Sequence, residues 1–190
     1  MPYIFKYRTT SNKNWCAKLK CGRGKYCNKV TTIPYDICLK HTTKYNLLIK
    51  RTSLINPSTG RRYNFDGLYA YSPKHHKTNT PVFRRYEKIC TYVGEPLTEK
   101  QLIKRYPCSQ STAPYVVRKN KNSYFDAALQ RGIASFTNTK PNHNNATLRD
   151  NRYEVFMKAT KHIYHLDEIF VFYGRGYDFT SCRHSTVKVA

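Results

Sequence analysis

The sequence predicts a mainly β protein made of small sheets with few short helices, preceded by a zinc-binding module. Two observations carry this prediction. From Leu47 onward, short runs of β-branched and aromatic residues alternate with turns rich in glycine, proline and asparagine. Before Leu47, cysteines and one histidine are spaced over a segment too short to build a hydrophobic core of its own. We therefore expect a module over residues 1–45, a β domain over 46–180 and a tail over 181–190.

The elements of the larger domain are predicted from hydrophobic periodicity and turn residues. Strands are expected over residues 47–55, 82–93, 115–117, 124–127 and 155–159, and a short apolar piece lies at 67–70. The segment between 71 and 81 is polar and is expected to be a loop. One helix is predicted over residues 97–105, with Thr98 as its N-cap and Pro107 beyond its end.

The last predicted strand covers residues 168–173 and runs into a glycine turn. The run Glu168-Ile-Phe-Val-Phe-Tyr173 is almost entirely apolar, which is typical of a buried strand. Gly174 and Gly176 follow, and glycine adopts the backbone angles of a sharp turn without strain. Tyr173 and Tyr177 flank this turn, so their phenol groups can be set around a shared opening. Taken alone, the stretch favours a core strand followed by a hairpin.

The charge balance favours a polyanionic partner. Lys and Arg number 34 against 11 Asp and Glu, which gives a formal net charge of +23. The imbalance is greatest in the first 65 residues, where Asp36 is the single acidic residue. Such a surface attracts nucleic acid first, and acidic proteins or membranes second. We therefore expect the basic N-terminal region to contact nucleic acid.

The chain also predicts a reducing, intracellular setting. No apolar run approaches the roughly 20 residues that a membrane span requires. The apolar run within the first six residues is too short for the core of a signal peptide. In that setting, the seven cysteines indicate metal ligands or free thiols rather than disulfides.

Five residues near the N-terminus are candidate zinc ligands. Thiolates and an imidazole in a short, loop-rich segment suit tetrahedral zinc, which would replace the missing core. The preferred set is Cys16, Cys27, Cys38 and His41, because ten residues separate each pair of successive cysteines and the last two residues form a Cys-x2-His pair. Cys21 is then spare. The alternative is a group of ordinary buried cysteines.

Six motifs in the larger domain follow one another in an order typical of a single family. They are Gly67-Leu-Tyr-Ala70, Thr91-Tyr-Val-Gly-Glu-Pro-Leu-Thr98, Tyr124-Phe-Asp-Ala127, Arg131-Gly-Ile-Ala-Ser-Phe-Thr-Asn138, Asn144-Asn-Ala146 and Asp167-Glu-Ile-Phe-Val-Phe-Tyr-Gly174. On these motifs the chain resembles SET-domain protein lysine methyltransferases, over roughly two-thirds of its length. Its compact form is most similar to the SET proteins of large DNA viruses.

The resemblance implies a SET fold, with small curved β-sheets, few short helices and a C-terminal pseudoknot. In that pseudoknot, residues 138–145 would thread beneath the loop after Tyr173, which is unusual because true knots are rare. The resemblance also implies that S-adenosylmethionine lies in one pocket, while the target lysine enters from the opposite side through an aromatic channel.

The family's functional residues carry over to matching positions. Gly67, Leu68 and Tyr69 would contact the methionine part of the cofactor, and Asn138 and Thr139 the adenosine end.

The same resemblance makes Tyr173 the catalytic tyrosine and Tyr124 and Tyr177 candidates for the channel wall. Tyrosines suit this chemistry because the nucleophile is a neutral lysine amine, and a dry channel lowers the pKa of that amine. Aromatic rings stabilise the positive charge as the methyl group moves to nitrogen.

The chain departs from the family pattern at several positions. Thr139 stands where the family has histidine, and Phe65 stands where the first glycine of the cofactor loop is expected. The leading interpretation is a lysine methyltransferase that acts on a histone-like or viral chromatin-like protein in the nucleus, or in a virion. The alternative is a catalytically degenerate, SET-derived basic protein with a structural or nucleic-acid-binding role.

Overall fold

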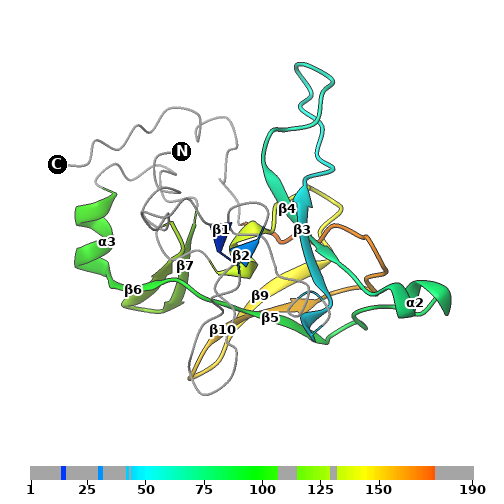
Figure 1. Ribbon diagram of the computed structural model, residues 1–190. Coiled ribbons are helices and arrows are strands. Elements are labelled where there is room, and N and C mark those ends of the chain that lie inside the picture. The colour runs from blue at the N-terminus through cyan, green and yellow to red at the C-terminus, as the bar shows by residue number, and fades with distance from the viewer. Residues whose placement is uncertain are drawn as a thin grey trace.

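Small antiparallel sheets and few helices make up the computed structural model, which confirms the predicted mainly β class (Figure 1). The structure describes residues 14–15, 30–31, 42, 44–106, 115–128 and 132–173. In these residues the sheet orders are β1–β2, β3–β4, β5–β10–β9 and β6–β8–β7. The strands are β1 Asn14–Trp15, β2 Val30–Thr31, β3 Leu47–Arg51, β4 Asp66–Ala70, β5 Lys88–Tyr92, β6 Glu95–Thr98, β7 Val116–Asn120, β8 Ser123–Asp126, β9 Ala146–Asp150 and β10 Val155–Ala159. The helices are α2 Pro73–Lys77, α3 Glu99–Arg105 and the 3-10 helix η2 Ile133–Phe136.

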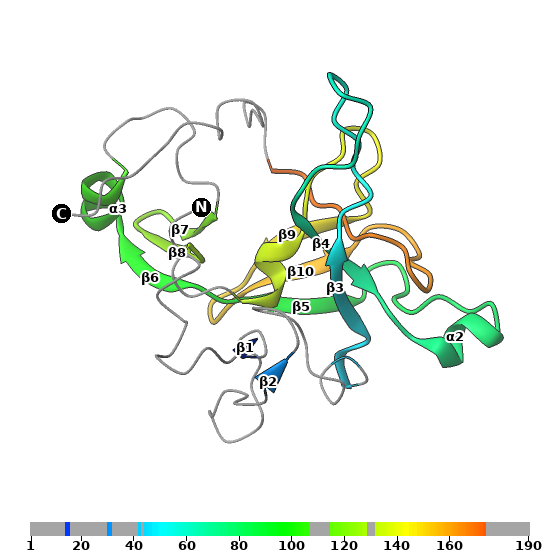
Figure 2. The ribbon, with the colours of Figure 1, turned by 45° about the horizontal axis from the view of Figure 1, so that its top comes forward.

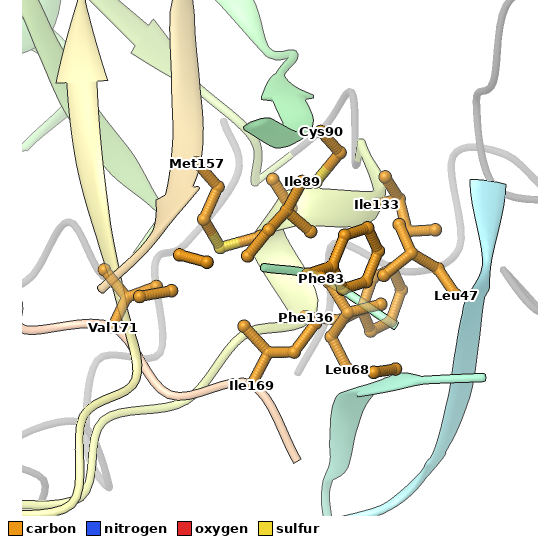
Figure 3. Packing of buried hydrophobic residues seen from close by; sticks show 14 of the residues in the cluster. Leu47, Leu68, Phe83, Ile89, Cys90, Ile133, Phe136, Met157, Ile169 and Val171 are labelled. Carbon is orange, nitrogen blue, oxygen red and sulfur yellow. The ribbon is translucent and has the colours of Figure 1, made fainter. Parts of the chain in front are cut away.

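The main hydrophobic core lies between the β3–β4 hairpin, the β5–β10–β9 sheet and η2 (Figure 3). Every residue of η2 is buried, and the helix contacts both β4 and β5. Burial of a large aliphatic or aromatic side chain contributes roughly 1.5–3 kcal/mol, so these side chains dominate the stability of the domain. The core includes Leu47, Leu68, Phe83, Ile89, Ile133, Phe136, Met157, Ile163, Ile169 and Val171.

A long connection between β3 and β4 forms an arm that extends away from the sheets (Figure 2). The predicted strand over 47–55 ends at Arg51, because the chain leaves the β3–β4 ladder there. The arm closes on itself through an isolated bridge between Ile55 and Arg62. Gly60 sits at its tip with φ +64°, a conformation that glycine adopts without the Cβ clash of other residues.

The β6–β8–β7 sheet carries α3 and is drawn apart from the β3–β4 hairpin (Figures 1 and 2). The predicted N-cap is confirmed: the Thr98 hydroxyl accepts from the Gln101 N–H at 3.3 Å, and the Gln101 side chain accepts from the Thr98 N–H at 2.8 Å. This reciprocal pair is a capping box, which satisfies two N–H groups at the start of the helix.

An ion cluster joins α3 to its sheet. The Arg105 guanidinium donates to both oxygens of Glu95 at 2.9 and 3.0 Å and to Asp126 Oδ2 at 2.8 Å. The hydrogen bonds to Glu95 and then those to Asp126 raise the pKa of Arg105, although burial opposes them. Asp126 is fully buried, and its carboxylate accepts hydrogen bonds from Arg105, the Tyr106 hydroxyl and the Ala128 N–H.

Besides the 47–55 strand, three predicted elements differ from the structure. The strand over 82–93 exists only as β5, because the chain turns at Tyr86, whose φ is +73°. The polar segment 71–81 holds the short helix α2 rather than a loop alone. The stretch 168–173 is buried as expected over its first four residues, but it pairs through isolated bridges rather than a regular ladder.

Of the predicted N-terminal module the structure describes β1 and β2, which pair with Trp15 opposite Val30. The predicted zinc ligands Cys16, Cys27, Cys38 and His41 lie outside the described residues. Within the described part of the chain, no helix is long and apolar enough to cross a membrane.

Candidate functional site

The stretch 168–173 lies against three segments that are distant in sequence. Glu168 bridges to Tyr69 on β4, Phe170 bridges to Asn138 in parallel, and Val171 bridges to Ala146 at the start of β9. A single extended segment therefore joins the β3–β4 hairpin to the loop that follows η2. The sequence of this stretch is apolar because the three segments bury it, although it forms no regular strand with any one of them.

Asn145 fixes the 138–146 loop to this stretch. Its side-chain amide donates to the Glu168 carbonyl at 2.9 Å and accepts from the Phe170 N–H at 2.9 Å. Its own N–H donates to the Phe170 carbonyl at 3.1 Å, and the Val171 N–H donates to the Asn138 carbonyl at 2.8 Å. These contacts bring together the segments of the expected pseudoknot. The loop after Tyr173, beneath which they would thread, lies outside the described residues.

Glu168 is a buried carboxylate that accepts hydrogen bonds from four residues. Oε1 accepts from the Thr52 hydroxyl at 2.6 Å and from Asn138 Nδ2 at 3.0 Å. Oε2 accepts from the Ser53 N–H at 2.6 Å, the Ser53 hydroxyl at 2.5 Å and the Tyr69 hydroxyl at 2.9 Å. Burial alone would raise the pKa of Glu168, but the bonds from Ser53, Thr52 and Asn138 outweigh it and lower the pKa below its ordinary value.

Gly67 lies directly beneath this carboxylate. A Cβ at position 67 would fall 2.1 Å from Glu168 Oε1 and 3.2 Å from Asn138 Nδ2. The glycine is therefore required for close packing against Glu168. The Asn138 amide nitrogen also donates to the Asp66 carbonyl at 3.1 Å and to the Thr52 hydroxyl at 3.2 Å, so Asn138 and β4 are held as one unit.

Tyr173 reaches the same unit through its hydroxyl. The half-buried Tyr173 hydroxyl donates to the Thr137 carbonyl, immediately before Asn138. A phenol oxygen and a backbone carbonyl oxygen thus converge next to the Asn138 network. At this carbonyl the predicted catalytic tyrosine meets the predicted cofactor segment.

The other predicted site residues are placed differently. Leu68 is fully buried in the core, so its side chain cannot face a ligand. The Tyr69 hydroxyl is occupied by Glu168 and by the Arg51 carbonyl at 3.0 Å, and burial followed by the Glu168 contact raises the pKa of Tyr69. Tyr124 is half-buried in β8, on the β6–β8–β7 sheet. Tyr177 lies outside the described residues.

Two cavities flank the Glu168 network. The larger, of about 390 Å³, lies between the arm and the turn at Thr139 and has a largely apolar lining that includes Leu54, Ile55, Pro57 and Tyr63. The smaller, of about 290 Å³, lies over Tyr69 and Glu168 and is lined also by Lys140, His143, Asn145 and Phe170. The larger cavity includes Thr139 and is within the size range of small-ligand pockets.

The sequence pattern does not predict this network. The strand expected over 47–55 includes Thr52 and Ser53, and the strand expected over 168–173 begins at Glu168. The one available signal was a glutamate within an otherwise apolar run, because a buried acid requires partners. Two of its donors, Ser53 and Thr52, are 115 and 116 residues away in the chain, so the sequence pattern could not name them.

The sequence profile of the SET domain matches residues 79–174, which is just over half of the chain. With the fold described above, this match shows that the chain belongs to the SET-domain family, the family of protein lysine methyltransferases. A comparison with curated proteins found no match.

Solved structures of polycomb repressive complex 2 share this fold. One shows ctPRC2 in an autoinhibited conformation bound to S-adenosylmethionine; it is 17% identical with a TM-score of 0.52. Another, of the Chaetomium thermophilum complex, is 17% identical with a TM-score of 0.51. In each case the similarity covers 71% of this chain and 16% of the other chain, so this chain spans a small part of those proteins.

Proposed function

We propose that this protein is an S-adenosylmethionine-dependent protein-lysine N-methyltransferase. The observation that carries the proposal is the hydrogen bond from the Tyr173 hydroxyl to the Thr137 carbonyl, beside the Asn138 network, in a chain of the SET-domain family. Two oxygen atoms converge there from segments that the family resemblance assigns to the catalytic tyrosine and to the cofactor pocket.

The residues present fit the proposed cofactor. The largely apolar cavity beside Thr139, with Leu54 and Tyr63 in its lining, suits a flat, aromatic adenine ring. Asn138 and the backbone at Thr139 would hold the cofactor from the side of the network. When bound, S-adenosylmethionine supplies an electrophilic methyl group on a positively charged sulfonium.

The chain's own contribution is positioning and electrostatics. The Tyr173 phenol oxygen and the Thr137 carbonyl oxygen carry partial negative charge. They would stabilise the positive charge that passes from the sulfonium to the amine nitrogen. A lysine amine in a desolvated channel loses its proton more readily, and orientation of the amine accounts for much of the rate. Glu168 does not serve as a base in this proposal, because both of its oxygens are occupied by donors from the protein.

We further propose a histone-like or viral chromatin-like substrate. A strongly basic enzyme repels a basic substrate, and four of the described acids are buried or already paired with a cation. Asp126 and Glu168 are buried, Glu95 is bound to Arg105, and Glu154 is bound to Lys88. A nucleic acid bound by both proteins would offset this repulsion, which favours a substrate that associates with DNA or RNA.

Cofactor binding and methyl transfer test the proposal. Calorimetry should detect binding of S-adenosylmethionine, and radiolabelled cofactor with purified core histones, alone and on DNA, should report transfer. Tyr173→Phe removes the hydroxyl and should lower transfer by about 100-fold with near-normal cofactor affinity. Tyr153→Phe is the matched control, because Tyr153 is 80% exposed. No cofactor binding at millimolar concentration would favour the degenerate, structural alternative, and full activity of Tyr173→Phe would exclude Tyr173 as the catalytic residue.

We also propose that the N-terminal module binds one zinc ion through Cys16, Cys27, Cys38 and His41. The proposal is supported by the ligand types and their spacing in the sequence. Metal analysis of the purified chain should give one zinc per molecule, and Cys38→Ser should lower this value. A metal content well below one zinc per chain contradicts the proposal.

A further inference from the structure

A basic and aromatic surface lies at the end of the β5–β10–β9 sheet where β5 begins and β10 ends. The two chain segments run side by side there: the Tyr86 N–H donates to the Ala159 carbonyl at 2.8 Å, and the Ala159 N–H donates to the Glu87 carbonyl at 2.9 Å. The Arg85 N–H also lies 3.4 Å from His162 Nδ1. We call this the Tyr86 surface, and it comprises Arg84, Arg85, Tyr86, Lys158, Lys161 and His162.

Tyr86 is held in an unfavourable conformation and gains little burial from it. Its φ is +73°, a region that a bulky residue rarely adopts and that costs about 1–3 kcal/mol. Its side chain nevertheless remains 58% exposed. The β5–β10 register also shifts between Met157 and Lys158, opposite Ile89 near the start of β5. Backbone strain and ladder irregularities of this kind concentrate at functional sites, so the exposed ring calls for a functional explanation.

One cation from each segment lies close to the Tyr86 ring. The Arg85 guanidinium lies 4.5 Å and the Lys158 ammonium 5.4 Å from the Tyr86 ring centroid. These cation–π contacts hold two long side chains near one place, which reduces the entropy lost when they bind a ligand. None of the three ion pairs among the described residues involves a cation of the Tyr86 surface. The acid within these segments is Glu87, and its carboxylate accepts from the Arg84 N–H at 2.8 Å.

We propose that the Tyr86 surface binds single-stranded nucleic acid, with a base against the Tyr86 ring and backbone phosphates on Arg85 and Lys158. Aromatic rings interleaved with cations are the features by which proteins bind single strands without sequence preference. A duplex would not use the ring, because its bases are already stacked on each other. A lipid surface fits less well, because the apolar neighbours Phe83, Ile89 and Ile163 are buried and cannot insert.

The test is fluorescence anisotropy of the full chain with an oligothymidylate of about 15 nucleotides, repeated over a range of salt concentrations. Because the whole chain carries a net charge of +23, some binding will come from other regions. The variant Arg85→Gln/Lys158→Gln is therefore compared with Arg149→Gln/Arg152→Gln, which removes the same charge elsewhere. Both control arginines are exposed. We expect the first variant to lose several-fold more affinity, and its logarithmic salt slope to fall by about 1.4, at about 0.7 for each lost phosphate contact.

Tyr86→Asn separates stacking from charge. Asparagine tolerates positive φ, so this variant should fold at least as well as the parent, which thermal melting will verify. We expect it to bind the oligonucleotide at least about fivefold more weakly, the lower limit for loss of one stacked base. Its salt slope and its affinity for a duplex of equal length should be unchanged. Tyr153→Asn is the control for an exposed tyrosine elsewhere.

Three results would overturn the inference. The first is an equal loss of affinity in the two double variants, which would mean that only total charge matters. The second is unchanged oligonucleotide binding by Tyr86→Asn, which would remove the single-strand assignment. The third is an equal effect of Tyr86→Asn on binding to polyglutamate or to phosphatidylserine vesicles, which would assign the surface to an acidic protein or a membrane. Methyl transfer to free histones does not enter these measurements, so the inference and the proposed activity can fail separately.

Discussion

Replacement of Glu168 by glutamine tests whether the buried carboxylate holds the candidate site together. The side chain keeps its size, so the change isolates charge and hydrogen-bonding capacity. The two carboxylate oxygens accept five hydrogen bonds in the native structure. Glutamine offers one acceptor oxygen and one donor amide, and the charge that strengthens all five bonds is lost.

The magnitude follows from which donors are left without an acceptor. If the glutamine oxygen takes the Oε2 position, Ser53 and Tyr69 keep their bonds. The amide then faces the Thr52 hydroxyl, which can rotate, and Asn138 Nδ2, which cannot accept. Asn138 keeps two other acceptors, Thr52 and the Asp66 carbonyl. One donor–donor contact and several weakened bonds should lower the free energy of unfolding by about 3 kcal/mol. The melting temperature should fall by roughly 6–12 °C.

The pH dependence supplies a second, independent readout. The pKa of Glu168 is lowered from 4.5, so the carboxylate stabilises the fold above that value and this contribution is lost as the pH falls through the folded-state pKa. The stability difference between the parent protein and Glu168→Gln should therefore be largest near pH 7 and shrink below pH 4.5.

Urea denaturation at pH 7 and at steps between about pH 5 and 3 measures both effects. Glu99→Gln is the matched control, because Glu99 is exposed in the first turn of α3 and should change the unfolding free energy by less than about 0.5 kcal/mol. The reasoning is refuted if Glu168→Gln matches this control at pH 7, or if its deficit persists unchanged at acidic pH.

Three further predictions concern burial and close packing. Gly67→Ala should destabilise the domain by about 2–4 kcal/mol, because its Cβ would collide with the Glu168 carboxylate; a change below 0.5 kcal/mol in urea denaturation would show that the carboxylate moves freely. Arg105→Gln should lower the unfolding free energy by about 3–5 kcal/mol because it leaves the buried Asp126 charge without its cation, and adding Asp126→Asn should restore part of the loss. Burial raises the pKa of the Cys90 thiol to about 12, so Cys90 should resist iodoacetamide at pH 8 in the native protein and react after unfolding, as mapped by mass spectrometry. Rapid native labelling of Cys90 would contradict the placement of β5 in the core.

The charge distribution connects the proposed activity to the Tyr86 surface. Within the described residues, Asp126 and Glu95 are paired with Arg105 and Glu154 with Lys88, whereas Glu87, Glu99, Asp150 and Asp167 are exposed. Lys and Arg greatly outnumber these acids over the whole chain, so its net charge repels a basic substrate. If the Tyr86 surface holds a nucleic acid strand, that strand can attract the substrate instead. This arrangement predicts that single-stranded nucleic acid stimulates methylation of histones at moderate salt and that the stimulation declines in Tyr86→Asn.

Local sequence signals determined those features that depend on neighbouring residues. The mainly β class followed from short apolar runs between turn residues, and the start of α3 followed from Thr98 with Gln101 three positions later. The family followed from short motifs in a fixed order, and the match over residues 79–174 confirms it. Tyr173 and Asn138 were singled out by these motifs, and the structure brings their segments into contact.

Tertiary contacts decided the features whose partners are far apart in the chain. The apolar run at 168–171 predicted a strand, yet its backbone bridges β4, Asn138 and Ala146 in turn. Gly67 was assigned to the cofactor, whereas the structure shows that it also makes room for the Glu168 carboxylate. Leu68 was assigned with it, but strand alternation directs Leu68 into the core. Hydrophobic periodicity reports whether a residue is buried, not which distant segment buries it, so Thr52, Ser53 and Glu168 became one network only when the chain had folded.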